Sequence, residues 1–450
     1  MSERKIRRLP ANPGTSGWLS LSERRMTLAA LERDIAADWL IIGAGFAGLS
    51  AARRLAQLRP GSRIVVLDAK RVAEGPAGRN SGFMIDVPHN LSSGNYSSGN
   101  AGQSRQEIAH NRHAIEFASS AANEYGMSRA TFDSCGKING AASERGEKHN
   151  SEFAASLAAI GEAFTLLDSR AMAELTGTTY YTSGIHTPGA AMIQPADYIH
   201  ALAAGLRASA HVLLYENSPV VGMRRESDRW VAECIRGSVT APKVIVAVNG
   251  YVEDFGYFRG RLMHVFTYAS MTKALRMGMA GFGRTGAPAW GLLPADPMGA
   301  TVRKITVGDH ERIVIRTRFT YDPKLTVSDN RVARIAAQQR RSFDRRFPHL
   351  NGLDFEQSWA GALCLSLNSV PAFGEVEEGV YSACCDNGLG TVKSTLAGLL
   401  AAELAVGTRS RILEEFVCQA APSRLPPPPL AFLGVNAVIR WQEWRAGREA

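Results

Sequence analysis

Residues 38–68 decide the fold of this chain, and they read DWLIIGAGFAGLSAARRLAQLRPGSRIVVLD. The apolar run 39–42 predicts a buried parallel strand that leads directly into a glycine-rich turn. Apolar residues then recur at helical spacing until Pro60-Gly61 ends the helix. The apolar run 64–67 predicts a second strand, which ends on Asp68. The stretch therefore predicts a strand, a tight turn, a helix and a second strand in that order.

This order is the one that a dinucleotide-binding site requires. Gly43 permits the tight turn, Gly45 lets the backbone approach a pyrophosphate, and Gly48 lets the helix pack closely on the strand. The N–H groups at the start of the helix can bind the phosphates. Asp68 lies where a carboxylate accepts hydrogen bonds from ribose hydroxyls, which disfavours NADP but does not separate NAD from FAD.

The next motif points to FAD. Residues 75–83 read GPAGRNSGF, which resembles the Gly-x-Ser-Gly-Arg-Asn-Gly-Gly stretch of the D-amino-acid oxidase-like flavoproteins. That family includes glycine oxidase, sarcosine oxidase and gamma-glutamylputrescine oxidase. Ala77 and Ser81 replace the commoner Ser and Gly of the motif.

Further blocks resemble the same family in the same order, so that the resemblance covers roughly residues 36–411. They are a helix start at 194–198, a strand at 218–221 beside the adenine, a late strand with its polar end at 244–250, and a strand, glycine turn and helix over 379–404. The resemblance implies non-covalent FAD, because the position equivalent to the flavin-linking cysteine of some members falls on Gly361 rather than on Cys364.

The resemblance also implies an α/β fold: a Rossmann-like FAD-binding domain and a second lobe built on a mostly antiparallel sheet over the flavin. Period-two alternation over 301–306 and 312–318 supports such a sheet. The expected division of the chain is an N-terminal arm at 1–35, a discontinuous FAD-binding domain at 36–95, 195–253 and 355–411, a substrate domain at 96–194 and 254–354, and a C-terminal proline-containing tail at 412–450.

The cofactor-binding residues that we expect come from these blocks. They are Gly43, Gly45, Phe46, Ala47, Gly48, Asp68, Ala69, Gly78, Arg79, Asn80, Ser81, Gly82, Val220, Asn249, Gly250, Asn387, Gly388, Leu389, Gly390 and Thr391.

The family acts on the C–N bond of small amines and amino acids, so a carboxylate-binding arginine is the most informative residue to find. Arg303 is the first candidate, and Arg316 and Arg318 on the next predicted strand compete with it; any of them could instead be a structural strand arginine. His264 could tune the protonation of the amine or be a buried structural histidine. Tyr268 could line the pocket or pack in the core.

Composition sets the remaining expectations. The net charge is +9, and part of the excess lies in the first 25 residues. We interpret it as a solvated arm and an active site suited to anions rather than as a surface for nucleic acid or membrane, because no nucleic-acid motif accompanies it. The six scattered cysteines lack zinc spacing, and no apolar run is long enough to span a membrane. We therefore expect a cytoplasmic protein without a bound metal.

The expected reaction is oxidation of a small amine or amino acid by hydride transfer to the flavin, with molecular oxygen as the acceptor. An N-substituted glycine, an iminodiacetate-like or opine-like secondary amine and a primary amino acid all remain open as substrates, as does the oligomeric state. The alternatives are a dehydrogenase with another electron acceptor, and a flavoprotein that is non-catalytic or acts on RNA. A non-catalytic protein would lack a charged anchor in its pocket.

Overall fold

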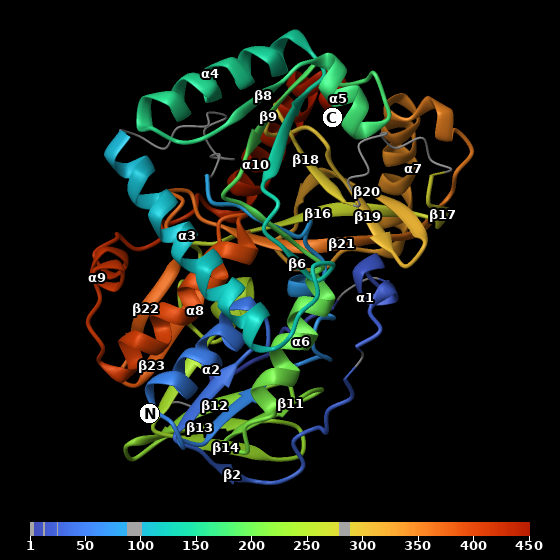
Figure 1. The fold of residues 1–450 in the computed structure, drawn as a ribbon. Helices are drawn as coiled ribbons and strands as arrows, with labels where there is room; N and C mark the ends of the chain where they lie inside the picture. Colours follow the sequence, from blue (N-terminus) through green and yellow to red (C-terminus); the bar gives the residue numbers. More distant parts are fainter. Residues whose placement is uncertain (1–3, 12–13, 25, 88–100, 279–288) are drawn as a thin grey trace.

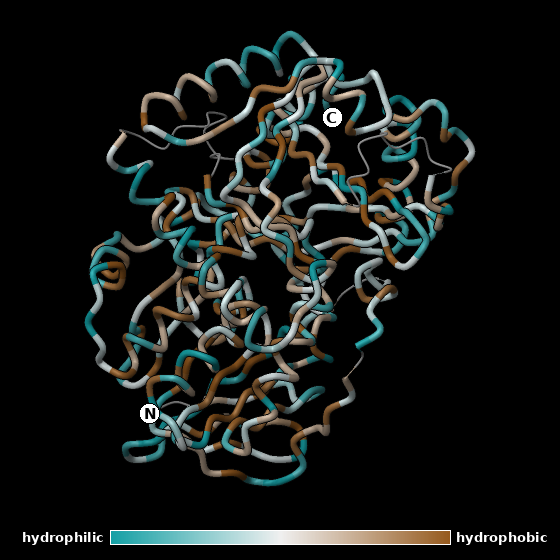
Figure 2. The backbone as a smooth tube through the Cα atoms, viewed as in Figure 1, coloured by the Kyte–Doolittle hydropathy of each residue, from teal (hydrophilic) through white to brown (hydrophobic). Residues whose placement is uncertain are grey.

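The computed structural model describes residues 4–11, 14–24, 26–87, 101–278 and 289–450 (Figure 1). Two large sheets organise it, one in each lobe, and the chain passes several times between them. The hydrophobic positions run through the strands in the interior, whereas the long outer helix α4 (Glu144–Ile160) is hydrophilic over its first half and more hydrophobic over its second (Figure 2). The α/β fold predicted from the sequence is confirmed.

The first sheet has six strands and contains the predicted dinucleotide unit. Its order is β11-β4-β3-β15-β23-β22, and all neighbours are parallel except β22 and β23. The strands are β3 (Trp39–Ile42), β4 (Ile64–Leu67), β11 (Val212–Tyr215), β15 (Lys243–Val246), β22 (Ala372–Glu377) and β23 (Val380–Cys384).

Helices cover one face of this sheet. They are α2 (Phe46–Leu58), α3 (Ala101–Glu124), α6 (Pro195–Arg207) and α8 (Gly390–Val406). Helices α2 and α8 cross closely because Gly398 has no side chain; a Cβ there would lie 2.0 Å from the carbonyl oxygen of Ala47. This crossing brings the N-termini of both helices to the same end of the sheet, where β3 and β23 finish.

A five-stranded sheet covers the other face, in the order β1-β12-β13-β14-β2. Its strands are β1 (Arg4–Lys5), β2 (Ile35–Ala36), β12 (Gly222–Glu226), β13 (Arg229–Glu233) and β14 (Ser238–Ala241). The segment 218–221, which we predicted as a strand, is instead an irregular connection between β11 and β12. The family resemblance implied that strand, but the edge of the sheet is occupied by 212–215, which pairs with β4.

The second lobe is built on a nine-stranded sheet, in the order β21-β16-β20-β19-β18-β7-β9-β8, with β17 paired to β20. Its recorded neighbours are antiparallel apart from the β18–β7 pair. The strands are β7 (Lys137–Ala141), β8 (Thr165–Leu167), β9 (Ser183–Thr187), β16 (Met263–Thr272), β17 (Leu275–Arg276), β18 (Trp290–Pro294), β19 (Thr301–Val307), β20 (His310–Tyr321) and β21 (Phe355–Leu365).

The remaining elements are short or peripheral. A small sheet of β5 (Phe83–Met84), β10 (Ala191–Ile193) and β6 (Phe132–Asp133) joins the two lobes, and α7 (Asp329–Arg346) covers one face of the large sheet. The other helices are α1 (Gly17–Leu21), α5 (Ser169–Thr176), α9 (Arg411–Val417) and α10 (Pro428–Ala446). Single 3₁₀ turns occupy Pro76–Gly78, Asn249–Glu253, Pro348–Leu350 and Gly447–Glu449.

Two expected boundaries differ from the structure. Strand β21 was assigned to the FAD-binding domain, but it pairs with β16 in the sheet of the second lobe. The N-terminal arm was interpreted as solvated, yet β1 pairs with β12 and Trp18 is fully buried. Arg4 binds Glu377 and Tyr257, and Arg8 binds Asp254, so acidic partners in the body hold the arm in place.

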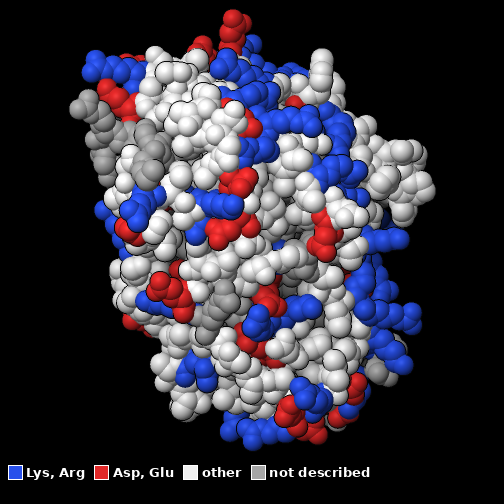
Figure 3. All heavy atoms as spheres, turned by 90° about the vertical axis from the view of Figure 1, so that its right-hand side faces the viewer, with Lys and Arg blue, Asp and Glu red and all other residues white. Residues whose placement is uncertain are grey.

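On the face that carries α7, basic and acidic side chains are interspersed, with basic ones in excess (Figure 3). Within the described ranges, no helix combines the length and apolar character needed to cross a membrane, and no group of histidine, cysteine or carboxylate side chains there could hold a metal ion.

Candidate active site

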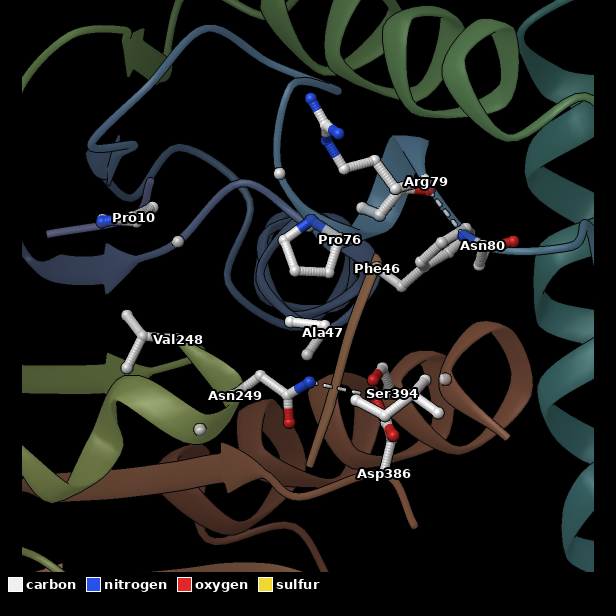
Figure 4. Close-up of a pocket in the computed structure, with 18 of the residues that line it drawn as sticks. Pro10, Phe46, Ala47, Pro76, Arg79, Asn80, Val248, Asn249, Asp386 and Ser394 are labelled. Atoms are coloured by element: carbon white, nitrogen blue, oxygen red, sulfur yellow. Dashed lines mark hydrogen bonds between the residues drawn. The ribbon is translucent and has the colours of Figure 1, made fainter. Parts of the chain in front are cut away.

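A deep pocket lies at the end of the six-stranded sheet, between the two lobes, where the starts of α2 and α8 meet (Figure 4). Helix α2 begins after Gly45 and helix α8 after Leu389, and neither capping residue supplies a side-chain acceptor to the first turn. Both helices are long, so their N-termini present uncapped N–H groups and partial positive charge. Such a pair of helix starts suits a ligand with phosphate and carbonyl oxygens.

The turn before α2 depends on glycine, as the sequence predicts. Gly43 has φ +107°, and a Cβ there would lie 2.4 Å from the carbonyl oxygen of Ala247. A Cβ on Gly48 would lie 1.7 Å from the carbonyl oxygen of Gly43, so only glycine lets α2 pack this closely on the turn.

Asp68 lies at the pocket wall, at the carboxyl end of β4. Its carboxylate accepts hydrogen bonds from the backbone N–H of Ala44 at 2.8 Å and of Lys70 at 2.9 Å. Burial raises the pKa of Asp68 to about 6, so the group is mainly ionised at neutral pH. Each carboxylate oxygen accepts one hydrogen bond from a backbone N–H and can still accept another from a hydroxyl group of a ligand.

The loop 76–82 forms another part of the wall. Arg79 donates to the carbonyl oxygens of Glu74 at 2.8 Å, Ala360 at 3.2 Å and Gly14 at 2.5 Å, so its guanidinium fastens the loop to β21 and to the N-terminal arm. The side chain of Asn80 bridges its own loop, donating to Ala77 and accepting from the N–H of Gly82.

A third polar feature joins the 3₁₀ turn at 249–253 to the start of α8. Asn249 donates to Asp386 at 3.1 Å and accepts from the N–H of Cys385 at 3.1 Å (Figure 4). The other oxygen of Asp386 accepts from the N–H of Gly388 at 3.0 Å. Burial raises the pKa of Asp386 to about 6.

Most of the predicted cofactor residues line this single pocket. They are Gly43, Gly45, Phe46, Ala47, Asp68, Ala69, Arg79, Asn80, Ser81, Val220, Asn249, Gly250, Gly388, Leu389, Gly390 and Thr391. Gly48, Gly78, Gly82 and Asn387 do not line it. They act on the backbone around it: Asn387, for example, accepts from the N–H of Ser366 and so ties the turn before α8 to the end of β21.

Arg316 is the predicted catalytic residue whose position suits a substrate anchor. It lines the pocket from β20, donates to the hydroxyl of Thr301 at 2.7 Å and lies 5.2 Å from the ring of Phe319. Burial lowers the pKa of Arg316 to about 10, so it stays charged at neutral pH. In the described part of the chain, no recorded ion pair neutralises it.

Arg303, our first candidate, lies outside the pocket lining. Its guanidinium is buried beneath the loop 76–82, where one nitrogen donates to the carbonyl oxygens of Ser81, Gly82 and Ile193 at 2.8–3.1 Å. The rings of Trp18 and Phe83 enclose it. This placement corrects our expectation: Arg303 supports the loop, and Arg316 becomes the candidate anchor.

A bulge in β20 explains why the side chains of Arg316 and Arg318 point in different directions. The ladder with β16 pairs Thr317 with Tyr268 and Phe319 with Thr267, so Arg318 is an extra residue without a partner in the ladder, and its φ is +64°. Its guanidinium reaches Gln338 of α7 at 2.9 Å and Glu443 of α10 at 2.5 Å. Strict alternation predicted that Arg316 and Arg318 point together, and the bulge breaks it.

The other two predicted catalytic residues, His264 and Tyr268, make their recorded side-chain contacts with the body of the protein. His264 lies behind the pocket wall, where its Nε2 is 2.7 Å from a carboxylate oxygen of Glu253. Tyr268 is among the lining residues, but its ring packs with Val332 and Ile335 of α7 and its hydroxyl lies 2.7 Å from that of Thr320. Burial raises the pKa of Tyr268, which keeps the phenol protonated.

With the pocket described, comparison with known proteins is informative. Residues 38–404 match the model of a family described as FAD dependent oxidoreductase. The chain belongs to this family.

Individual proteins are similar to this chain over almost their whole length. A probable oxidoreductase OrdL of Rhizobium meliloti (strain 1021) is 24% identical over 90% of this chain and 91% of its own. The gamma-glutamylputrescine oxidoreductase of Escherichia coli (strain K12) is 25% identical over 88% of this chain and 90% of its own. The crystal structure of glycine oxidase from Geobacillus kaustophilus shares the fold, with a TM-score of 0.68, 19% identity, and coverage of 87% of this chain and all of that one.

FAD is therefore the cofactor of this oxidoreductase, as the sequence predicted, and the pocket fits it. Two uncapped helix starts suit a pyrophosphate and a ring carbonyl, and Asp68 suits a ribose. The expectation of a non-covalent flavin stays a prediction; Cys364 is buried and is not among the residues that line the pocket.

Sequence reasoning missed several lining residues of this FAD-dependent oxidoreductase. Ile6, Arg8, Leu9 and Pro10 reach the pocket only because the arm folds back onto the body, and no local signal marks that. Asp386 could have been found, because it opens the glycine turn DNGLG that we had already identified.

Proposed function

We propose that this protein oxidises the C–N bond of a small amine or amino acid that carries a carboxylate, with FAD as hydride acceptor and molecular oxygen as the final electron acceptor. The imine product would hydrolyse in water. The observation that carries the proposal is the charged guanidinium of Arg316 in the wall of the FAD pocket. Three substrate classes carry the carboxylate that this guanidinium would bind: N-substituted glycines, iminodiacetate-like or opine-like secondary amines, and primary amino acids.

The residues of the pocket would serve the substrate in three ways. Arg316 binds the carboxylate through its planar fork. Its positive charge also disfavours the ammonium form of the substrate and favours the neutral amine that can lose a hydride. Phe319 and Leu293 supply apolar walls that exclude water. FAD, when bound, accepts the hydride, so the protein's task is to orient the substrate carbon.

Other observations favour an enzyme of this type over the alternatives. A non-catalytic flavoprotein was expected to lack a charged anchor, and Arg316 supplies one. The names of two similar proteins, a gamma-glutamylputrescine oxidoreductase and a glycine oxidase, refer to an amine and to an amino acid. All six cysteines are unpaired, which supports our proposal of a reducing, cytoplasmic location.

A substrate panel tests the proposal. The flavin-loaded protein is mixed without oxygen with glycine, sarcosine, iminodiacetate, opines, D- and L-amino acids and matched amines that lack the carboxylate. We expect at least one carboxylate-bearing amine to bleach the yellow flavin, and its carboxylate-free analogue to do so far more slowly. Equal bleaching by both would contradict the role of Arg316, and no bleaching by any would contradict the reaction.

Admitting air then separates oxidase from dehydrogenase. We expect the flavin to recover its colour quickly and to release hydrogen peroxide in proportion to the substrate consumed. Slow recovery in air with rapid recovery on adding a dye acceptor would identify a dehydrogenase and would overturn oxygen as the acceptor, while leaving the C–N oxidation intact.

A further inference from the structure

Helix α10 has two apolar faces, and only one of them is covered. A helix turns by about 100° per residue, so residues three or four apart lie on one side. Val435 and Ile439 face inward and belong to one hydrophobic cluster with Val265 and Phe319 of the large sheet, and Ala431 on the same side is buried. The outward stripe consists of Leu430, Leu433, Ala437, Trp441 and Trp444.

The inner face fixes the helix in place. Glu443 pairs with Arg318 at 2.5 Å and accepts from the N–H of Phe319 at 2.9 Å, so α10 is tied to the bulge in β20. Beyond the helix, the buried carboxylate of Glu449 accepts from the N–H groups of Ala142 at 3.0 Å and Asp296 at 2.8 Å. Helix α10 is therefore a rigid part of the surface, and its outer stripe cannot turn inward.

The outer stripe is unusually exposed for apolar side chains. Leu430 is 64% exposed, Leu433 67%, Trp441 52% and Trp444 78%. A helix that is apolar on both sides is normally buried on both sides. A contiguous exposed apolar surface of this kind marks an interaction site.

The stripe is symmetric about its centre. Leu433 and Trp441 lie four residues before and after Ala437, and Leu430 and Trp444 lie seven residues before and after it. The smallest side chain is therefore at the middle and the large ones are at both ends. Two such helices, laid antiparallel about a two-fold axis at Ala437, would place Leu430 against Trp444 and Leu433 against Trp441 of the other copy.

We propose that this stripe is the contact between two copies of this chain, packed through α10 about a two-fold axis at Ala437. A two-fold contact requires a surface complementary to itself, and the pattern about Ala437 meets that requirement. The small central side chain allows close approach of the helices. The two tryptophans and two leucines of the stripe keep 52–78% of their surface exposed, and a second copy would bury this apolar area.

The charges beside the stripe permit this pairing. Arg440 and Arg445 are exposed, and in the antiparallel arrangement they lie opposite Gly434 and Pro429 of the other copy rather than opposite each other. Arg440 pairs with Glu443 at 2.8 Å, a carboxylate that it shares with Arg318, and Arg445 stacks on Trp441 at 4.5 Å. The alternative occupant, an anionic membrane surface, would account for exposed tryptophan and arginine but not for the symmetry about Ala437.

A disulfide at the axis tests the proposal. The full flavin-loaded protein carries Cys418→Ser, to remove the exposed native thiol, together with Ala437→Cys. Residue 437 would meet its own copy at the axis, so we expect a disulfide-linked dimer under mild oxidation. The matched control, Arg440→Cys in the same background, lies at the side of the stripe and should cross-link at least tenfold more slowly. Equal rates would overturn the two-fold arrangement.

Mass measurement in solution is independent of the engineered cysteine. We expect the unmodified protein to be a dimer at micromolar concentration, and Ala437→Glu to weaken the dimer at least about a hundredfold, because two like charges would meet at the axis. Unchanged flavin content and melting temperature would show that the variant is folded. A monomer at all concentrations would overturn the proposal, and so would a monomer that floats with vesicles rich in phosphatidylserine, since the stripe would then bind membrane.

Discussion

Arg316 donates a hydrogen bond from its guanidinium to the hydroxyl of Thr301, with 2.7 Å between the two atoms, across the pairing of β20 with β19. The bond fixes one edge of the guanidinium and leaves the group at the wall of the FAD pocket. Since this contact orients the proposed substrate anchor, it gives the most direct prediction.

Replacing Arg316 with lysine should impair amino-acid oxidation selectively. Lysine keeps the charge but cannot form two parallel N–H bonds to a carboxylate. We therefore expect kcat/KM for an amino acid to fall, by an amount that corresponds to a loss of about 2–4 kcal/mol of transition-state stabilisation. Oxidation of an amine without the carboxylate should change little. Arg318→Lys, two residues away on the same strand but directed to α10, is the matched control and should not separate the two substrates.

Replacing Arg303 should affect folding and flavin retention instead of substrate choice. Its guanidinium satisfies three buried carbonyl oxygens, and Arg303→Met would leave them without a charged donor. We expect the free energy of unfolding to fall by at least about 3 kcal/mol. Denaturant titration measures this loss. A stable variant with a raised KM for amino acids alone would show that Arg303 binds substrate after all.

Asp68→Asn should weaken FAD binding. An amide keeps the shape but loses the charge that strengthens bonds to ribose hydroxyls, which costs roughly 1.5–3 kcal/mol or about ten- to hundredfold in Kd. Titration of the flavin-free protein with FAD measures the change. Asp38→Asn is the control, because that carboxylate binds the N–H of Arg63 at an exposed site at the opposite end of β3. Equal affinities of the two variants would exclude Asp68 from the binding site.

The buried carboxyl of Asp386 predicts a pH dependence of stability in the flavin-free protein. Burial raises its pKa from 3.8 to about 6. The folded state therefore binds a proton more tightly than the unfolded state, and this stabilisation is complete below pH 4 and lost as the pH rises through 6. The shift corresponds to at most about 3 kcal/mol.

Asp386→Asn should remove that dependence. The melting temperature of the wild-type protein should fall relative to that of the variant between pH 4 and pH 7, and the difference should then level off. The variant also changes the hydrogen bond to Asn249, and this adds a constant amount to the difference in melting temperature that does not vary with pH. Parallel melting curves across this range would contradict the raised pKa.

The sequence by itself determined the cofactor half of this protein. Residues 38–68 specify their strand, turn and helix through local pattern. Gly43 is required by its positive φ, and Gly48 by a backbone contact with Gly43 within the same segment. The glycine turn at 386–390 is equally local. Such features are readable because apolar periodicity and the need for a residue without a Cβ act over a few neighbouring positions.

Only the tertiary structure decided which of the candidate side chains line the pocket. Arg316 and Arg318 look equivalent in the sequence, but a bulge in the ladder with β16 separates them. Arg303 lies beneath a loop more than two hundred residues away in the chain, and the N-terminal arm reaches the pocket through pairing of β1 with β12. Ladder register and loop docking arise from contacts between distant segments, and the pattern of any single segment does not encode them.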